Sequence, residues 1–137
     1  MPDTVRKVDY YYTTTPDKPG EGARVLGVLR DAGMNLLAFH AFPSARRTQL
    51  DFVPANATAF VAAAKAAKIK LSKPKTVFLF EGDDRIGAMA AILGKLAAAK
   101  INATASEAVC TSGGRFAGLL WVKPKDVNRA AQALGAV

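Results

Sequence analysis

The sequence has few of the features that form disulfides, direct secretion or span a membrane. It contains a single cysteine, Cys110, which excludes an internal disulfide. Its apolar runs are interrupted by lysines, as at Lys65 and Lys68, and fall short of the ~20 residues that a membrane helix needs. The N-terminal residues contain no apolar segment typical of a secretory signal. We therefore expect a cytoplasmic protein with no membrane partner.

Groups for catalysis and metal binding are equally scarce. The only histidine, His40, has no cluster of further metal ligands around it in the sequence, so we expect a packed or solvent-facing side chain. Cys110 has no histidine and acid at a recognisable spacing, which favours an inert or half-buried thiol. The glycines at 113 and 114 fit a hairpin turn, and no phosphate-loop pattern occurs. The sequence therefore predicts no cofactor, no metal and no enzyme activity.

Acidic side chains are few relative to basic ones. The chain has 19 lysines and arginines against 11 acids, a net charge of +8, which raises nucleic acid as a partner. The basic residues are spread along the chain, however, without an arginine-rich run or an aromatic and basic RNA-binding strand. Nucleic acid is thus an unlikely partner. The alternative remains a regulator that contacts nucleic acid or a partner protein through its basic surface, without a small ligand.

What the sequence does contain is an internal repeat at an offset of 67 residues, from 102 − 35. The repeat pairs a turn and the apolar stripe of the helix that follows it. The matched pairs are Asp17 and Asp84, Gly20 and Gly87, Val25 and Ile92, Leu26 and Leu93, Leu29 and Leu96, and Asn35 and Asn102. The sequence therefore predicts two units, residues 1–73 and 74–137.

Hydrophobic periodicity predicts the same element order in both units. Each has a first strand, an acidic turn, a helix, a strand hairpin and a second helix. The first unit ends in a short strand at residues 69–71, which completes βαββαβ. In the second unit only residues 135–137 remain, which gives either a vestigial strand or an open sheet edge that invites another copy. We expect an α+β protein of tandem ferredoxin-like units, with antiparallel sheets and helices on one face.

The residues around the first helix resemble the ACT domain, a ferredoxin-like, amino-acid-sensing module. The resemblance rests on Asp17-Lys18-Pro19-Gly20 before the helix and on Gly33-Met34-Asn35-Leu36 after it. The second unit is similar, with Asp84-Arg85-Ile86-Gly87 and Lys100-Ile101-Asn102-Ala103, but it lacks the proline and the second glycine. The resemblance covers nearly the whole chain.

The resemblance implies that an amino acid or a similar small metabolite binds between paired units. The residues carried over are Asp17, Pro19, Gly20 and Asn35 in the first unit and Asp84, Gly87 and Asn102 in the second. Amides at a helix start suit a carboxylate, and side-chain oxygens suit an ammonium group. We expect a free-standing regulatory sensor that forms a homodimer and has a partner enzyme as a possible target.

Each of these residues also has a purely structural interpretation. Asp17 and Asp84 could cap helices, the two glycines could serve turn geometry, and the two asparagines could be left-handed residues after a helix. A small hydrolase of the acylphosphatase kind is a further alternative, but the acidic turn at residues 13–22 suits a phosphate poorly. If the two sites are unequal, we favour the first, because its prolines stiffen the loop.

Overall fold

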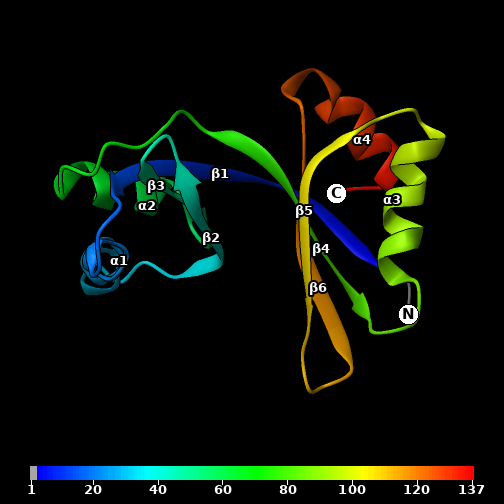
Figure 1. Cartoon of the computed structure of the whole chain (residues 1–137), viewed down its shortest axis with the longest axis horizontal. Helices are drawn as coiled ribbons and strands as arrows, with labels where there is room; N and C mark the ends of the chain where they lie inside the picture. The colour runs from blue at the N-terminus through cyan, green and yellow to red at the C-terminus, as the bar shows by residue number, and fades with distance from the viewer. Residues whose placement is uncertain (1–2) are drawn as a thin grey trace. The chain divides into compact units, whose positions relative to one another are not determined.

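A computed structural model describes residues 3–137, which form two compact units (Figure 1). The first unit is Asp9–Lys75. The second unit is Thr76–Val137 together with the described residues up to Val8. The beginning of the chain therefore groups with the second unit, whereas the sequence repeat placed it in the first.

The elements follow the order that the repeat predicts. The first half contains β1 (Thr4–Pro16), α1 (Glu21–Asp31), β2 (Leu36–Ser44), β3 (Arg47–Pro54) and α2 (Ala57–Ala66). The second half contains β4 (Lys75–Asp83), α3 (Ala88–Ala98), β5 (Ala103–Cys110), β6 (Arg115–Val122), the 3₁₀ turn η1 (Pro124–Asp126) and α4 (Val127–Leu134).

The strand pairs β1–β3, β2–β3, β4–β6 and β5–β6 are antiparallel. Hydrogen bonds join the strands in the order β2-β3-β1 in the first unit and β1-β4-β6-β5 in the second. In the second unit, α3 and α4 lie on the same side of the strands (Figure 1). This architecture confirms the α+β class and the tandem ferredoxin-like units expected from the sequence.

Strand β1 is long enough to contribute side chains to the cores of both units. Val5, near its start, is buried in the core of the second unit with Phe78 and Ile92. Tyr11, six residues later, is buried in the core of the first unit, where its ring centroid lies 5.8 Å from that of Phe60. Burying each large apolar side chain contributes about 1.5–3 kcal/mol, so both cores hold this one strand in place.

The expected strand at residues 69–71 is absent, which corrects the sequence prediction. The segment still lies beside β1, since the Ser72 N–H donates to the Tyr12 carbonyl at 2.8 Å. The Tyr12 N–H, however, bonds to the Ser72 hydroxyl at 3.0 Å rather than to a backbone carbonyl. A side-chain acceptor thus replaces the ladder bond that would extend a strand, although Ile69 and Leu71 pack against the core.

The end of the second unit contains no regular strand, but its residue Val137 pairs with the start of β1. The Val137 N–H donates to the Val5 carbonyl at 3.1 Å, and the Lys7 N–H donates to the Val137 carbonyl at 3.0 Å. Since β1 is the neighbour of β4, the start of β1 takes the place that a final strand of this unit would fill.

All four α-helices are followed by a residue in the left-handed conformation. Gly33 and Lys100 have φ of 77° and 58°, and Lys68 and Gly135 have φ of 60° and 67°. In each case the next N–H donates to the carbonyl five residues earlier, as from Ile101 to Leu96 at 2.9 Å. The pairs Gly33 with Lys100 and Lys68 with Gly135 obey the 67-residue offset, so the helix ends repeat as well.

Candidate functional site

The turn between β1 and α1 is built on a glycine cap rather than an aspartate cap. Gly20 occupies the N-cap position with φ 88°, a conformation that other residues rarely adopt. Asp17 accepts a hydrogen bond from the Thr48 hydroxyl at 3.2 Å instead of bonding to a helix amide. Asp17 and Pro19 are exposed. The capping interpretation of Asp17 is therefore wrong, and turn geometry explains Gly20.

The turn between β4 and α3 repeats this design. Gly87 is the N-cap residue of α3, with φ 82° and no side-chain cap bond. The Asp84 N–H donates to the Gly114 carbonyl at 2.9 Å, and its carboxylate accepts from the Cys110 thiol at 3.2 Å. Asp84 thus ties the turn to the β5–β6 hairpin and does not cap the helix either.

The two predicted asparagines are not left-handed residues, so that structural interpretation is wrong too. The left-handed positions are Gly33 and Lys100, each two residues earlier in the chain. Asn35 and Asn102 instead follow the helix end and lead into β2 and β5, where both are exposed. Their side chains are therefore available to solvent or to a ligand.

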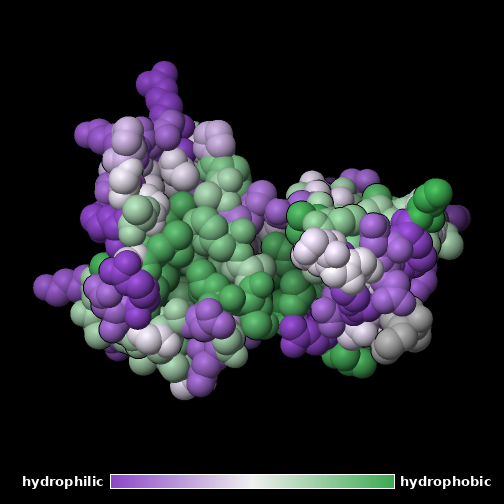
Figure 2. Space-filling model, turned by 90° about the horizontal axis from the view of Figure 1, so that it is seen from below, coloured by the Kyte–Doolittle hydropathy of each residue, from purple (hydrophilic) through white to green (hydrophobic). Residues whose placement is uncertain are grey.

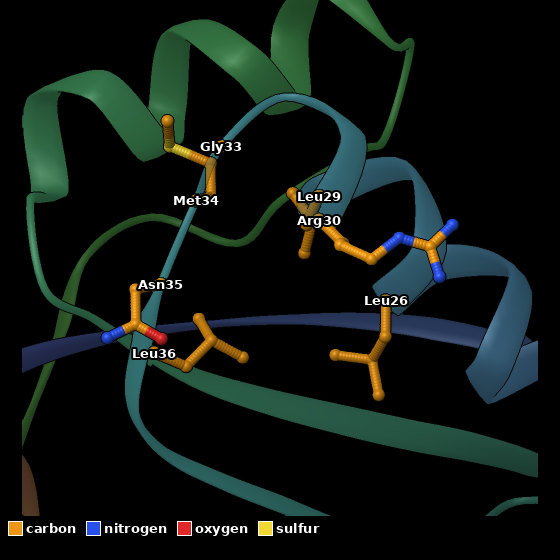
Figure 3. Close-up of a pocket in the computed structure, with 7 residues that line it drawn as sticks. All are labelled: Leu26, Leu29, Arg30, Gly33, Met34, Asn35 and Leu36. Carbon is orange, nitrogen blue, oxygen red and sulfur yellow. The ribbon is translucent and has the colours of Figure 1, made fainter.

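Asn35 lines a cavity of about 350 Å³ between α1 and the start of β2, which we call the α1–β2 cavity (Figure 3). Leu26 and Leu36 point into the space between the helix and the strand, with the Asn35 amide at its edge (Figure 3). The full lining is Leu26, Leu29, Arg30, Gly33, Met34, Asn35 and Leu36. Asp17, Pro19 and Gly20 do not line this cavity, so the predicted residues of the first unit are not brought together there.

A cavity of about 290 Å³ lies at the start of α3 and is called the β4–α3 cavity below. It combines two predicted residues, Asp84 and Gly87, with groups from the end of β5 and from β6. The full lining is Asp84, Arg85, Gly87, Ala88, Met89, Ala90, Ala108, Val109, Cys110 and Phe116. Asn102 is not part of it. The acid and glycine of the repeat therefore meet in one cavity in the second unit, against our preference for the first.

Two polar contacts at the β4–α3 cavity shift the pKa values of the groups that they join. The hydrogen bond to the Asp84 carboxylate, together with burial, raises the pKa of the Cys110 thiol, which keeps it protonated at neutral pH. Cys110 is exposed, not half-buried as the sequence suggested. The Arg85 guanidinium makes two hydrogen bonds of 2.9 Å to the Asp3 carboxylate and lowers the pKa of that group.

Sequence reasoning missed Arg85, Val109, Cys110 and Phe116 as members of this cavity. The sequence points only weakly to Arg85. It lies between the repeated acid and glycine and matches Lys18 at the 67-residue offset, so both turns carry a basic residue there. Its hydrogen bond to Asp3 joins residues 82 positions apart, and no pattern in the neighbouring sequence predicts it. Strand pairing, which places Cys110 opposite Phe116, brings the remaining groups together.

The described residues offer little for other kinds of site. Within residues 3–137, no group of three histidine, cysteine, aspartate or glutamate side chains could hold a metal ion. None of the helices in that range is long and apolar enough to cross a membrane. On the face drawn in Figure 2, each unit shows hydrophilic side chains beside hydrophobic surface.

Comparison with known proteins finds similar structures but no match to a sequence family. The sequence matches no protein-family model and no curated protein. Protein BT0572 from Bacteroides thetaiotaomicron is similar in structure, with a TM-score of 0.79 and 18% identity over 97% of this chain and 88% of that one.

Regulatory subunits of aspartate kinase are also similar. The ligand-free subunit from Thermus thermophilus has a TM-score of 0.64 and 15% identity over 98% of this chain and 96% of that one. The subunit from Thermus flavus has a TM-score of 0.61 and 17% identity over 98% and 94%. These likenesses show the fold and support the ACT-like architecture expected from the sequence.

Proposed function

We propose that this protein is a regulatory module, not an enzyme, and that it binds an amino acid or a similar small metabolite in the β4–α3 cavity. The observation that carries the proposal is the meeting of Asp84 and Gly87, the repeated acid and glycine, in one cavity at the start of an 11-residue helix.

The cavity has complementary groups for each part of an amino acid. The first amides of α3 and the positive end of its dipole suit a carboxylate, and left-handed Gly87 has no side chain to block the approach. The Asp84 carboxylate suits an ammonium group. Met89, Val109 and Phe116 supply apolar surface for a side chain.

The regulatory part of the proposal is supported by the fold. Structures of the same fold include regulatory subunits of the enzyme aspartate kinase. We propose that this chain likewise acts on a partner enzyme, and that ligand binding changes the contact between them.

We also propose that the module works as a homodimer formed through β5. β5 stands last in the strand order of its unit, and residues 104–110 are exposed on both faces. Its side chains are small or apolar apart from Glu107, and Val109 is 65% exposed. Natural edge strands usually carry lysine, proline or other features that block pairing, so a strand of this kind suits a second copy.

A thermal-shift screen with the twenty amino acids tests the ligand. A ligand at 100 times its dissociation constant should add ~2.7 kcal/mol to the free energy of unfolding. Asp84→Asn should abolish the shift, whereas Asp17→Asn, the same change at the matched position of the first unit, should retain it. The absence of any shift at millimolar concentration, or an equal loss in both variants, would argue against the proposed site.

A further inference from the structure

Asp3 and Arg85 form a contact with the geometry of a bound carboxylate. The two guanidinium nitrogens of Arg85 donate to the two carboxylate oxygens of Asp3, each at 2.9 Å. This paired arrangement of charged hydrogen bonds is stronger and more specific than a single neutral hydrogen bond to a carboxylate. The Asp3 side chain is only 9% exposed, although it lies at the edge of β1. Most surface ion pairs, by contrast, are held loosely and in water.

The chain leaves room for this carboxylate at Gly82. A Cβ atom on Gly82 would overlap the Asp3 carboxylate and would lie 2.9 Å from the Phe116 ring. The Arg85 guanidinium also lies over the Phe116 ring, with its central carbon 5.8 Å from the ring centroid. Gly82, Arg85 and Phe116 therefore form a cradle that fits a carboxylate and is closed by any larger residue at position 82.

The carboxylate cradle shares Arg85 and Phe116 with the lining of the β4–α3 cavity, whereas Gly82 and Asp3 are not part of that lining. Asp3 lies 82 residues before Arg85 in the chain and makes no part of the turn. The contact therefore joins the start of β1 to the turn between β4 and α3.

We infer that Gly82, Arg85 and Phe116 form a binding site for the carboxylate of a small ligand, and that Asp3 occupies this site as an internal competitor. A ligand that takes Arg85 releases the start of β1 from its ion pair. The inference rests on the proposed function for the identity of the ligand, and it places the ligand's carboxylate at Arg85 instead of at the first amides of α3.

Chemical rescue tests the carboxylate site with acetate as the probe. Asp3→Ala should lower the melting temperature, and sodium acetate at about 50 mM should restore much of it, whereas sodium chloride of equal ionic strength should not. The wild-type protein should respond little to acetate, because Asp3 already fills the site. Asp3→Ala combined with Arg85→Ala should show no rescue.

Asp126→Ala is the matched control. Asp126 pairs with Arg129 through one bond of 3.2 Å, and its side chain is 14% exposed, but no glycine cradle surrounds it. Acetate should therefore not rescue this variant. If Asp3→Ala fails to fold, Asp3→Ser serves in its place, since the short hydroxyl leaves the cradle open. Acetate acting no better than chloride, or rescuing the double variant equally, would overturn the inference.

The amino-acid screen separates this inference from the proposed function. Rescue by acetate without a shift from any amino acid, in the wild type or in Asp3→Ala, would support the carboxylate site and contradict the proposed ligand. Amino-acid shifts that are the same in wild type and Asp3→Ala, without acetate rescue, would support the function and overturn the competition.

Discussion

The Asp84 carboxylate controls the chemistry of the only cysteine in the sequence. It accepts a hydrogen bond from the Cys110 thiol, and a thiol can donate this bond only while it is protonated. The carboxylate charge also opposes the formation of a thiolate beside it. Both effects raise the pKa of Cys110, so an exposed thiol is made less reactive.

Asp84→Asn should therefore make Cys110 more reactive. Without the carboxylate the pKa of the thiol falls toward its ordinary value, the thiolate fraction at neutral pH rises, and alkylation by iodoacetamide should be several-fold faster. The pH at which the rate reaches half its maximum should move down. Asp126→Asn, a carboxylate change remote from the thiol, is the control. An unchanged rate profile in Asp84→Asn would show that this contact does not govern the thiol.

Single residues also show how much of the candidate site the sequence predicts. The repeat identifies Asp84 and Gly87 as ligand-binding residues, and the structure places both in the lining of the β4–α3 cavity, while their binding of a ligand stays a prediction. The capping role assigned to Asp84 fails because Gly87, at the N-cap position, already makes the turn. The Asp3 contact could not be predicted, since only the folded strand order brings its carboxylate to Arg85.

The helix ends show a mismatch between sequence and backbone. Each left-handed position favours glycine, because a side chain there crowds the next carbonyl. Gly33 and Gly135 satisfy this preference, whereas their repeat partners, Lys100 and Lys68, do not. The two units thus form the same turn with different residues, and the isoleucines that follow the lysines, Ile69 and Ile101, pack against the two cores.

Lys100→Gly should therefore stabilise the protein by about 1 kcal/mol, since it removes the left-handed strain. Urea denaturation measures the change as a higher midpoint with an unchanged slope. Lys95→Gly, in the interior of the same helix, is the control and should destabilise by about 1 kcal/mol. Loss of stability in both variants would show that the lysine at position 100 makes a contact that outweighs its strain.

The regular elements follow from the sequence for a simple physical reason. The stripes that contain Val25 and Leu29, and Ile92 and Leu96, are buried as their helical spacing predicts. The segment at residues 69–71 has the apolar pattern of a strand but lacks its ladder, because the Ser72 hydroxyl takes the bond. Hydrophobic periodicity does not predict whether a side chain or a backbone carbonyl accepts such a hydrogen bond.

The homodimer proposed to form through β5 depends on which side chains this edge strand exposes. Nearly every side chain of the strand is exposed, and it carries one acidic residue but no lysine, arginine or proline. β2 is the last strand of the first unit's order and includes Pro43, which cannot donate a ladder bond. The difference favours β5 over β2 as the pairing edge.

Ala105→Lys should weaken the homodimer, since two copies of a lysine would approach each other across the paired strands. Sedimentation velocity at several concentrations should show a shift toward the monomer. Ala41→Lys, the same change on β2, is the matched control and should leave the dimer intact. A monomeric wild-type protein, or equal dissociation of both variants, would contradict pairing through β5.

The hydrogen bonds between β1 and Val137 also bear on the order in which the protein folds during synthesis. A ribosome releases Val5 and Lys7 before the first unit and Val137 after it, yet the three are joined in the second unit. The start of β1 must therefore wait unpaired while the first unit, Asp9–Lys75, is made and can already fold. Completing the second unit requires contacts between residues far apart in the sequence, which we expect to slow its folding relative to the first unit.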